Sequence, residues 1–452
     1  MYRTLSGPLS CQLEVTTACN NKCQHCYNHW RTSSEKEVPL TLANAQRIMR
    51  MIADVGVHEL TLTGGEPLLN FDVLVSCLEL ANEFGIKPAL NSNLVTLTKR
   101  KAKVLRDLGL PGILTSVMGP NDQVHDSIAQ RKGAFKRTIS GIKVAQDAGI
   151  RVSANMVVSQ RNLDVIRDTA RLVASLGIKS FNATKVGCPG NCSDFSDMSL
   201  AKGQFIQYLI ELVAVSKETD LKCGHLEPYA LCALSSVDGA SGLESRRCPA
   251  GVTTCTISSN GSVRPCSHVD VQYGDLLIES ITSVWQRMED WRSGTFVPQV
   301  CRDCSLISQC GGGCRMESKM RSNGDMSALD PYMDTNGVDA AIMIHKTKVS
   351  STKSLDEARG EMRFRLRNHK IRKEPFGASV TVLEGNARIG SFFLNHAGLG
   401  VLEQFRQGCT YVSHDDRIDW GGIEDIEGFC TALIERGGAT ICKEGGETEV
   451  AC

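Results

Sequence analysis

The chain has 452 residues, and its 50 basic side chains balance 50 acidic ones, so the formal net charge is zero. Because the charges balance and no long run of like charges occurs, the sequence lacks the basic patch that nucleic-acid-binding proteins usually carry. No apolar stretch approaches the ~18 residues that a membrane-spanning helix needs. At roughly 150 residues per domain, the length of the chain predicts about three domains.

Cysteine is abundant, with 20 residues in the chain. Residues 1–10 contain no basic segment followed by an apolar one, as a secretion signal would. We therefore expect a cytoplasmic protein with reduced thiols rather than a secreted disulfide scaffold. Because thiolates bind zinc and iron-sulfur clusters, the spacing of the cysteines is the most informative pattern in the sequence.

Short strand-like runs alternate with helical patterns through the first half of the chain. The amphipathic stretches 42–53 and 135–148 are typical of the helices. Such alternation predicts parallel βα units, whose chemistry lies at the carboxyl ends of the strands. The predicted strands are residues 13–17, 59–63, 87–92, 112–117, 151–158 and 180–185.

The first predicted strand is followed by three cysteines within eight residues, Cys19, Cys23 and Cys26. Three thiolates on one loop can hold three irons of a [4Fe-4S] cluster and leave the fourth iron open. A structural zinc site is the alternative for these residues. The second predicted strand ends in Gly64, Gly65, Glu66 and Pro67.

This C-x3-C-x2-C loop followed by a Gly-Gly-Glu-Pro segment resembles the radical S-adenosylmethionine (SAM) enzymes. The resemblance implies a curved, open (βα)6 barrel, a partial TIM barrel. It also implies that the open iron binds the amino and carboxylate groups of SAM, and that residues 64–67 meet the methionine amino group.

Further residues fit the same SAM site by resemblance. Asn93 follows the third predicted strand. Ser116 and Arg131 resemble a serine and an arginine that, in radical SAM enzymes, lie near the ribose and the methionine carboxylate of SAM. A guanidinium suits a carboxylate because it donates two parallel hydrogen bonds. His25 would lie against the adenine. The alternatives are an ordinary strand-end serine, a surface arginine and an exposed loop histidine. Met118 stands where many relatives carry Asp.

A second group of cysteines resembles a SPASM domain, a radical SAM extension that holds two auxiliary iron-sulfur clusters. The resemblance implies that the first auxiliary cluster is bound by Cys248, Cys255, Cys266 and Cys314. It implies that the second is bound by Cys301, Cys304 and Cys310. A Cys-x2-Cys pair by itself is more typical of zinc, which remains the alternative.

The last ligand of the second auxiliary cluster departs from the SPASM pattern. Relatives usually carry a cysteine where this chain has Met333, and a thioether is a weaker ligand than a thiolate. The cluster would therefore have an open iron, use a carboxylate such as Asp330, use a cysteine from elsewhere, or be unstable. The remaining cysteines of this region are expected to be packed or surface thiols: Cys188, Cys192, Cys223 and Cys232.

A second departure concerns the reaction. Sulfatase-maturing relatives carry an aspartate base directly after the cysteine that corresponds to Cys266, whereas this chain has Ser267 and His268. Formylglycine formation is therefore disfavoured relative to another kind of peptide modification.

The C-terminal part begins with a polar linker at 346–360. Predicted strands at 378–383 and 388–394 and helices at 395–405 and 423–436 follow. This order resembles the RiPP recognition element (PqqD-like), a small winged helix that captures the leader of a ribosomally made, post-translationally modified peptide as an added strand. A DNA-binding winged helix is the alternative, but residues 423–436 lack the Lys/Arg-rich composition of a recognition helix.

The predicted architecture is α/β, with a radical SAM partial barrel at 1–220. A small cysteine-rich SPASM domain is predicted at 221–345, and a linker with a C-terminal α+β winged helix at 346–452.

The resemblance implies a radical SAM/SPASM oxidoreductase that acts on a precursor peptide, with SAM, one [4Fe-4S] cluster and two auxiliary clusters as cofactors. A 5'-deoxyadenosyl radical would take hydrogen from an unactivated carbon, and loss of a second electron would close a C-C, C-S or C-O link. The implied partners are the precursor peptide and a reductant such as flavodoxin or ferredoxin. One alternative is a Cα epimerase with Cys223 as hydrogen donor. The other is a non-catalytic electron carrier or peptide-binding scaffold.

Overall fold

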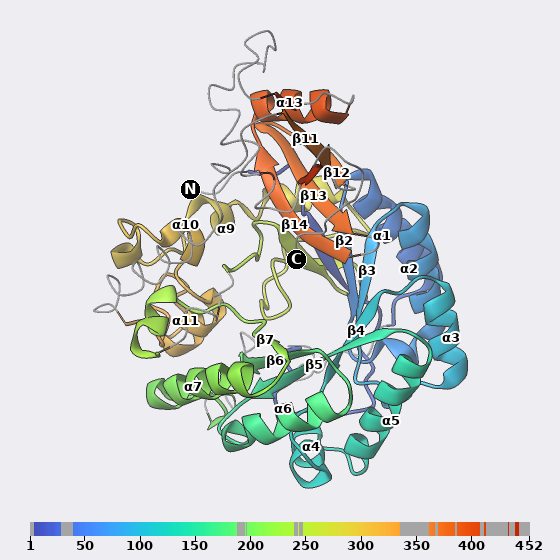
Figure 1. The fold of residues 1–452 in the computed structure, drawn as a ribbon, viewed down its shortest axis with the longest axis vertical. Helices are drawn as coiled ribbons and strands as arrows, with labels where there is room; N and C mark the ends of the chain where they lie inside the picture. The colour runs from blue at the N-terminus through green and yellow to red at the C-terminus, as the bar shows by residue number, and fades with distance from the viewer. Residues whose placement is uncertain are drawn as a thin grey trace. The chain divides into compact units, whose positions relative to one another are not determined.

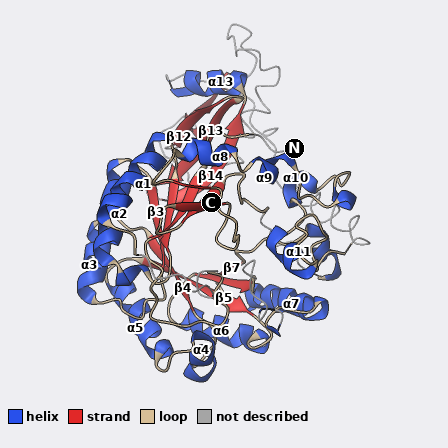
Figure 2. Cartoon of the chain, turned by 180° about the vertical axis from the view of Figure 1, so that it is seen from behind, coloured by secondary structure: helices blue, strands red, loops and turns tan. Residues whose placement is uncertain are grey.

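The protein is described by a computed structural model that covers residues 4–28, 39–187, 195, 197–238, 243, 247–334, 361–366, 369–384, 387–406, 411–412, 433 and 439–442. Its contacts divide the chain into two compact units, residues 1–347 and 348–452. The first unit contains a curved sheet with helices along its outer side (Figures 1 and 2).

The centre of this sheet is a run of parallel strands that neighbour one another in chain order. These strands are β1 (Ser10–Glu14), β2 (Glu59–Thr63), β3 (Lys87–Asn91), β4 (Gly112–Ser116), β5 (Arg151–Val158) and β6 (Ser180–Lys185). The helices that follow them are α1 (Leu42–Asp54), α2 (Phe71–Glu83), α3 (Lys99–Asp107), α4 (Asp122–Ala129), α5 (Ala134–Asp147), α6 (Ile166–Ser175) and α7 (Lys202–Glu218). The predicted α/β fold with a parallel sheet is confirmed.

The helices are amphipathic, as α1 illustrates. Thr41 caps this helix by accepting a hydrogen bond from the Asn44 backbone N–H at 3.2 Å. Ala45, Ile48 and Ile52 repeat at helical spacing and are fully buried. Burial of this apolar stripe holds the helix on the sheet.

The first strand lies earlier in the chain than predicted. Residues 13–17 were expected, but β1 begins at Ser10 because residues 10–13 pair with β2 on one side and with β8 (Thr254–Ile257) on the other. After Glu14 the chain leaves the sheet toward the cysteine loop. The strand on the second side, in which Cys255 pairs with Cys11, comes 244 residues later in the chain, so a local pattern does not show it.

The cysteine-rich segment extends this sheet at both ends. β7 (Lys222–Gly224) pairs in parallel with β6, and β8 pairs in parallel with β1. β9 (Ser262–Arg264) and β10 (Gly274–Asp275) add antiparallel strands beyond β8. The predicted domain boundary at residue 220 therefore lies between two strands of one continuous sheet, β6 and β7. The short helices here are α8 (Ile281–Gln286), α9 (Glu289–Ser293), α10 (Ile307–Cys310) and α11 (Arg315–Arg321).

Two buried ion pairs join the barrel strands to the cysteine-rich segment. Arg264 Nη2 lies 2.6 Å from Glu14 Oε1 at the end of β1. Lys185 Nζ, at the end of β6, lies 3.1 Å from Glu317 Oε2 of α11. All four side chains are at most 1% exposed. Because removing one partner leaves a buried charge unpaired, each pair makes the two parts interdependent.

We expect Lys185→Met to destabilise the protein by about 3 to 5 kcal/mol, because it leaves the Glu317 carboxylate buried without its cation. Urea denaturation under anaerobic conditions measures this. The double variant Lys185→Met/Glu317→Leu should recover much of the loss. The matched control is Arg171→Ala, whose exposed pair with Asp168 should contribute below about 1 kcal/mol. Equal effects of the two single variants would contradict the role given to burial.

The second unit contains two three-stranded antiparallel sheets. One is a meander of β12 (His369–Glu374), β13 (Gly377–Glu384) and β14 (Ala387–Leu394), followed by α13 (His396–Arg406). The other has β11 (Glu361–Leu366) between β15 (Tyr411–Val412) and β16 (Ala439–Cys442).

The core of this unit lies between the meander and α13. Ala378, Val380 and Val382 alternate along β13 and are buried, as are Val401 and Leu402 of α13. The predicted strands at 378–383 and 388–394 and the helix at 395–405 are present. The predicted linker 346–360 and all of the predicted helix 423–436 except residue 433 lie outside the described residues.

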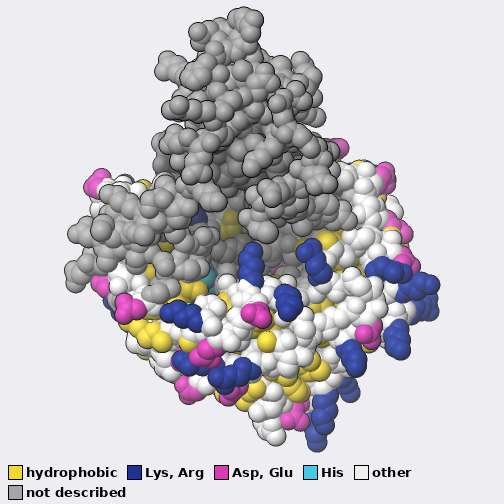
Figure 3. All heavy atoms as spheres, viewed as in Figure 1, with side chains coloured by type: hydrophobic (Ala, Val, Ile, Leu, Met, Phe, Trp, Pro, Cys, Tyr) yellow, Lys and Arg dark blue, Asp and Glu magenta, His cyan; other side chains and the backbone are white. Residues whose placement is uncertain are grey.

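The surface agrees with the balanced composition. In Figure 3, Lys and Arg side chains gather at the right-hand edge, over α3, and acidic side chains are interspersed elsewhere on the visible face. Among the described residues, no helix combines the length and hydropathy that a membrane crossing requires.

Candidate functional site

The cysteine loop and the Gly-Gly-Glu-Pro segment lie side by side because the backbone pairing of β1 and β2 continues past the sheet. Gly65 N donates to Thr16 O at 2.7 Å, and Glu66 N donates to Ala18 O at 2.8 Å. A Cβ at Gly64 or Gly65 would overlap these backbone carbonyls, and Gly64 has a φ of +131°. Only glycine allows this approach, which brings residues 64–67 next to Cys19.

The Glu66 side chain fixes the ends of two strands. It is fully buried, and Oε1 accepts hydrogen bonds from Ser92 Oγ at 2.7 Å and Leu68 N at 3.0 Å. Oε2 accepts from Asn93 N at 2.8 Å. Burial raises the pKa of the Glu66 carboxyl. Pro67 begins the short 3-10 helix that follows, Pro67–Leu69.

The cysteine loop is held in place by residues at and after the ends of β3 and α4. Asn93 Nδ2 donates to Asn20 Oδ1 at 2.6 Å, and Arg131 Nη1 donates to Asn20 O. The loop backbone also donates from Lys22 N to Ala129 O at 3.0 Å. Two of the predicted SAM-site residues, Asn93 and Arg131, thus contact the loop that carries the three cysteines.

His25 is buried rather than exposed, with 9% of its surface accessible. Burial, and next the neighbouring His125, lower the pKa of His25 to about 4, so the ring is neutral at pH 7. Ser116 is the last residue of β4, half-buried and in register with Asn155 of β5. Met118, two residues further on, donates its backbone N–H to His125 Nδ1 at 3.2 Å.

Several buried polar atoms around the cysteine loop have no hydrogen-bond partner among the described residues. They are Asn21 Oδ1, Gln24 Oε1, His25 Nδ1, Asn28 Oδ1 and Arg131 Nε. Buried polar groups are normally satisfied, and the three amide oxygens accept hydrogen bonds. The loop therefore fits a bound group that carries amino or hydroxyl donors, as SAM does.

Three cysteines of the first auxiliary set lie together. Burial raises the pKa of the Cys266 thiol to about 12, and the neighbouring Cys248 thiol raises it further. Burial likewise raises the pKa of Cys314, where the positive charge of Lys185 acts in the opposite direction and Cys248 adds to the rise. The Cys248 thiol is thus close enough to influence both Cys266 and Cys314.

Cys255, the fourth cysteine of the ligand set implied by resemblance, lies beside Cys11. It lies within β8, in register with Cys11 of β1, and is 1% exposed. Its Sγ is 3.6 Å from Cys11 Sγ. The parallel pairing of β8 with β1 places these two buried thiols next to each other.

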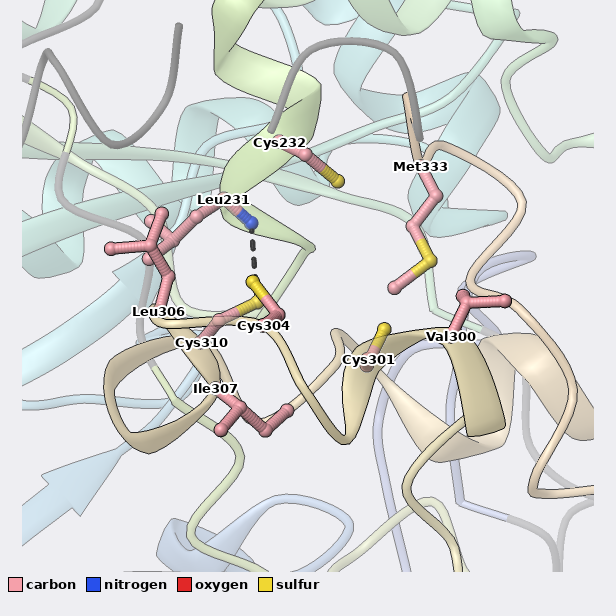
Figure 4. Close-up of a pocket in the computed structure, with 9 residues that line it drawn as sticks. All are labelled: Leu231, Cys232, Val300, Cys301, Cys304, Leu306, Ile307, Cys310 and Met333. Atoms are coloured by element: carbon pink, nitrogen blue, oxygen red, sulfur yellow. Dashed lines mark hydrogen bonds between the residues drawn. The ribbon is translucent and has the colours of Figure 1, made fainter. Parts of the chain in front are cut away.

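The second auxiliary set lines a cavity of about 140 Å³. Cys301, Cys304 and Cys310 contribute to its wall, together with Met333 and Cys232 (Figure 4). Among the described residues, no three His, Cys, Asp or Glu side chains converge as the ligands of a single metal ion would.

Sequence reasoning missed a polar pair between the two cysteine-bearing regions. His268 Nε2 lies 3.8 Å from Glu227 Oε1, and the His268 ring is 4.9 Å from the ring of Tyr27, the residue after Cys26. Burial raises the pKa of Tyr27, and Cys26 and Glu227 raise it further. Glu227 belongs to no motif, so only the fold reveals its position.

Comparison with known proteins identifies the class of this protein. Residues 13–173 match the radical SAM superfamily, and residues 248–305 match the SPASM iron-sulfur cluster-binding domain. The chain thus contains a radical SAM domain followed by a SPASM domain. The first implies SAM and a [4Fe-4S] cluster, and the second implies auxiliary iron-sulfur clusters.

Some of the similar proteins are named as haem synthases, and others are named as enzymes that cyclise or mature peptides. The AdoMet-dependent heme synthase of Methanosarcina barkeri is 27% identical over 74% of this chain and 98% of that protein. The PqqA peptide cyclase of Rhizobium meliloti is 25% identical, over 72% of this chain and 86% of that protein. The sporulation killing factor maturation protein SkfB of Bacillus subtilis is 29% identical, over 61% and 64%.

Solved structures share the fold. The structure of anSMEcpe with bound AdoMet superposes with a TM-score of 0.59 at 14% identity, covering 76% of this chain and 98% of that one. Streptococcus suis SuiB bound to S-adenosylmethionine gives a TM-score of 0.58 at 18% identity, covering 73% and 78%.

Proposed function

We propose that this protein modifies a ribosomally made precursor peptide by oxidative crosslinking at an unactivated carbon. The observation that carries the proposal is the second compact unit, which follows the radical SAM and SPASM domains and contains a meander whose outer strands, among the described residues, are β12 and β14. Relatives named as a peptide cyclase and as a killing factor maturation protein support it.

In this proposal Cys19, Cys23 and Cys26 hold the SAM cluster. When bound, the reduced cluster and SAM supply a 5'-deoxyadenosyl radical, the cofactor chemistry of this enzyme class. The residues assigned to position SAM are His25, Gly64, Gly65, Glu66, Pro67, Asn93, Ser116 and Arg131. The unsatisfied acceptor atoms of the cysteine loop support this assignment.

Closing a C-C, C-S or C-O link removes two hydrogens from the peptide. One leaves as a hydrogen atom to the deoxyadenosyl group, and the other leaves as a proton and an electron. We assign the proton to the pair of Glu227 and His268 because it lies between the two cysteine-bearing regions. The SPASM cysteines would hold an auxiliary cluster, which would supply an acceptor for this electron when bound.

The C-terminal unit is assigned to leader capture in the manner of a RiPP recognition element. β13 is the central strand of the meander, so β12 and β14 are its edges. An edge strand offers unpaired N–H and C=O groups to an extended peptide, and side-chain pockets add selectivity. Phe393 of β14 is 37% exposed and its ring is 5.9 Å from that of Phe376, which supplies an apolar surface at this edge.

Haem synthesis is the second candidate, because relatives carry that name. The match covers 98% of the Methanosarcina protein but 74% of this chain, so the rest of this chain has no counterpart there. Leader capture would give the C-terminal unit a role, whereas haem synthesis gives it none. We therefore favour the peptide substrate.

The reaction can be tested by counting hydrogens in the product. We expect anaerobic turnover with SAM, a strong reductant and the precursor peptide encoded beside the gene to give a product lighter by two hydrogen masses. This product should gain no deuterium at carbon in D2O. High-resolution mass spectrometry in both solvents measures this. The variant Cys223→Ser should give the same product, since crosslinking needs no thiol hydrogen donor.

Other outcomes identify the alternatives. An isobaric product that gains one deuterium in D2O means epimerisation, and its loss in Cys223→Ser would assign the hydrogen donor. An unmodified peptide together with 5'-deoxyadenosine formation on a porphyrin substrate would favour haem synthesis. A chain that never forms 5'-deoxyadenosine would be an electron carrier or a scaffold.

A further inference from the structure

The cavity next to α10 contains one cysteine that the SPASM pattern does not include. Cys232 lies in the 3-10 helix Leu231–Ser236, and the other thiols come from Cys301, Cys304 and Cys310. In Figure 4 the sulfurs of Cys232 and Cys301 point toward the same space from opposite sides. The Met333 thioether borders this space as well.

The size and lining of the cavity suit a compact inorganic group held by sulfur. Its volume of about 140 Å³ is close to the ~150 Å³ cavity that admits benzene in an engineered protein. Leu231, Val300, Leu306 and Ile307 form the rest of the wall, so the donor atoms directed into the space are sulfurs. A thiolate set in an apolar pocket is typical of an iron-sulfur cluster.

The carboxylate considered for the missing ligand is already engaged. Asp330 is 1% exposed, its Oδ2 accepts from Cys314 N at 2.9 Å, and its Oδ1 accepts from Tyr332 N at 3.0 Å. Asp330 is also not among the residues that line the cavity. It therefore shapes the backbone around Cys314 rather than binding iron.

We infer that Cys232 supplies the fourth thiolate of the second auxiliary cluster, in place of the cysteine that Met333 replaces. A thiolate is the stronger ligand for iron, so Met333 becomes a neighbour of the cluster rather than its ligand. The inference rests on the auxiliary clusters included in the proposed function, and goes beyond it by assigning the missing ligand.

The backbone next to Cys232 already contacts a ligand of this set. Leu231 N donates a hydrogen bond to Cys310 Sγ at 3.3 Å. Hydrogen bonds from backbone N–H groups to ligand sulfurs tune iron-sulfur clusters and orient their ligands. Leu231 therefore donates a hydrogen bond to a ligand of the cluster, Cys310, while Cys232 is itself a ligand of the same cluster.

The first test uses the unaltered protein. Reconstituted holoprotein is treated anaerobically with iodoacetamide, and each cysteine is quantified by peptide mass spectrometry before and after iron is removed with a chelator. Cys232 should be protected in the holoprotein and alkylated at least tenfold faster after chelation. Cys223 is the matched control, because it is also partly exposed, and its rate should change little. Equal alkylation of Cys232 in both states would overturn the inference.

The second test counts iron in a background that lacks the SAM cluster. In a Cys19→Ala/Cys23→Ala/Cys26→Ala chain, two auxiliary clusters should give about eight irons per chain. Adding Cys232→Ser should remove one to four of them, and adding Met333→Cys to that variant should restore them. An oxidised three-iron EPR signal in the Cys232→Ser chain would support the same conclusion.

Two controls separate the possible failures. Cys301→Ser should lose iron in the same background, and Cys223→Ser should not. If Cys301→Ser and Cys232→Ser both retain all iron, these cysteines hold no cluster and the inference fails, while the product-mass test of the proposed function still stands. If only Cys232→Ser retains it, Cys232 is not the ligand but the cluster stands. Circular dichroism identifies a variant that does not fold, and the alkylation result then decides.

Discussion

Replacing Cys19, Cys23 and Cys26 together by alanine is expected to abolish formation of 5'-deoxyadenosine from SAM, with a loss of at least a thousandfold. The three protein-bound irons of the cluster each need a thiolate, and alanine offers no ligand. The backbone pairing of residues 16–18 with 64–66 does not involve these side chains, so the fold should persist. Chromatographic quantification of 5'-deoxyadenosine under anaerobic reducing conditions measures the loss.

The appropriate control is Cys255→Ala, which removes a thiol from the barrel core and should leave SAM cleavage intact. Iron should remain at the auxiliary sites in the triple variant. SAM cleavage by that variant at the rate of the unaltered protein would show that the loop does not hold the reactive cluster.

Removal of residues 346–452 should separate peptide capture from radical chemistry. We expect the KM for the precursor peptide to rise at least a hundredfold, because the edge strands assigned to leader binding are lost. Slow SAM cleavage without peptide should continue, since the cysteine loop lies within the other compact unit. Steady-state kinetics with full-length and leaderless peptides measures both effects.

A core peptide without its leader provides the matched control, because both forms of the enzyme should modify it equally poorly. An unchanged KM for the full precursor would remove the recognition role from the C-terminal unit. Tight binding of duplex DNA by this unit, weakening steeply with salt, would favour the DNA-binding winged helix instead.

Local sequence patterns predicted the barrel well because each strand and helix carries its own signal. Residues 59–63, 151–158 and 180–185 are strands with the predicted bounds. Glycine at positions 64 and 65 also has a local physical cause, because a Cβ at either position would overlap a backbone carbonyl of the cysteine loop. In these cases the physical cause lies within a few neighbouring residues.

The sequence did not reveal the positions of residues that depend on contacts between distant segments. Cys255 fits a cysteine pattern, yet its pairing partner is Cys11, and a spacing rule does not encode that register. Cys232 and Glu227 lie outside every motif and reach their positions through the path of the chain after β7. Their roles depend on which side chains surround them, and that is a property of the fold.

The buried pair of Glu14 and Arg264 has a consequence for electron movement. Glu14 precedes the loop that carries Cys19, and Arg264 lies two residues before Cys266, so one 2.6 Å contact connects the segments assigned to two iron-sulfur sites. Tunnelling rates fall steeply with donor-acceptor separation. Because this contact is buried, it holds the two segments against each other. Clusters bound by these segments would therefore keep a constant separation.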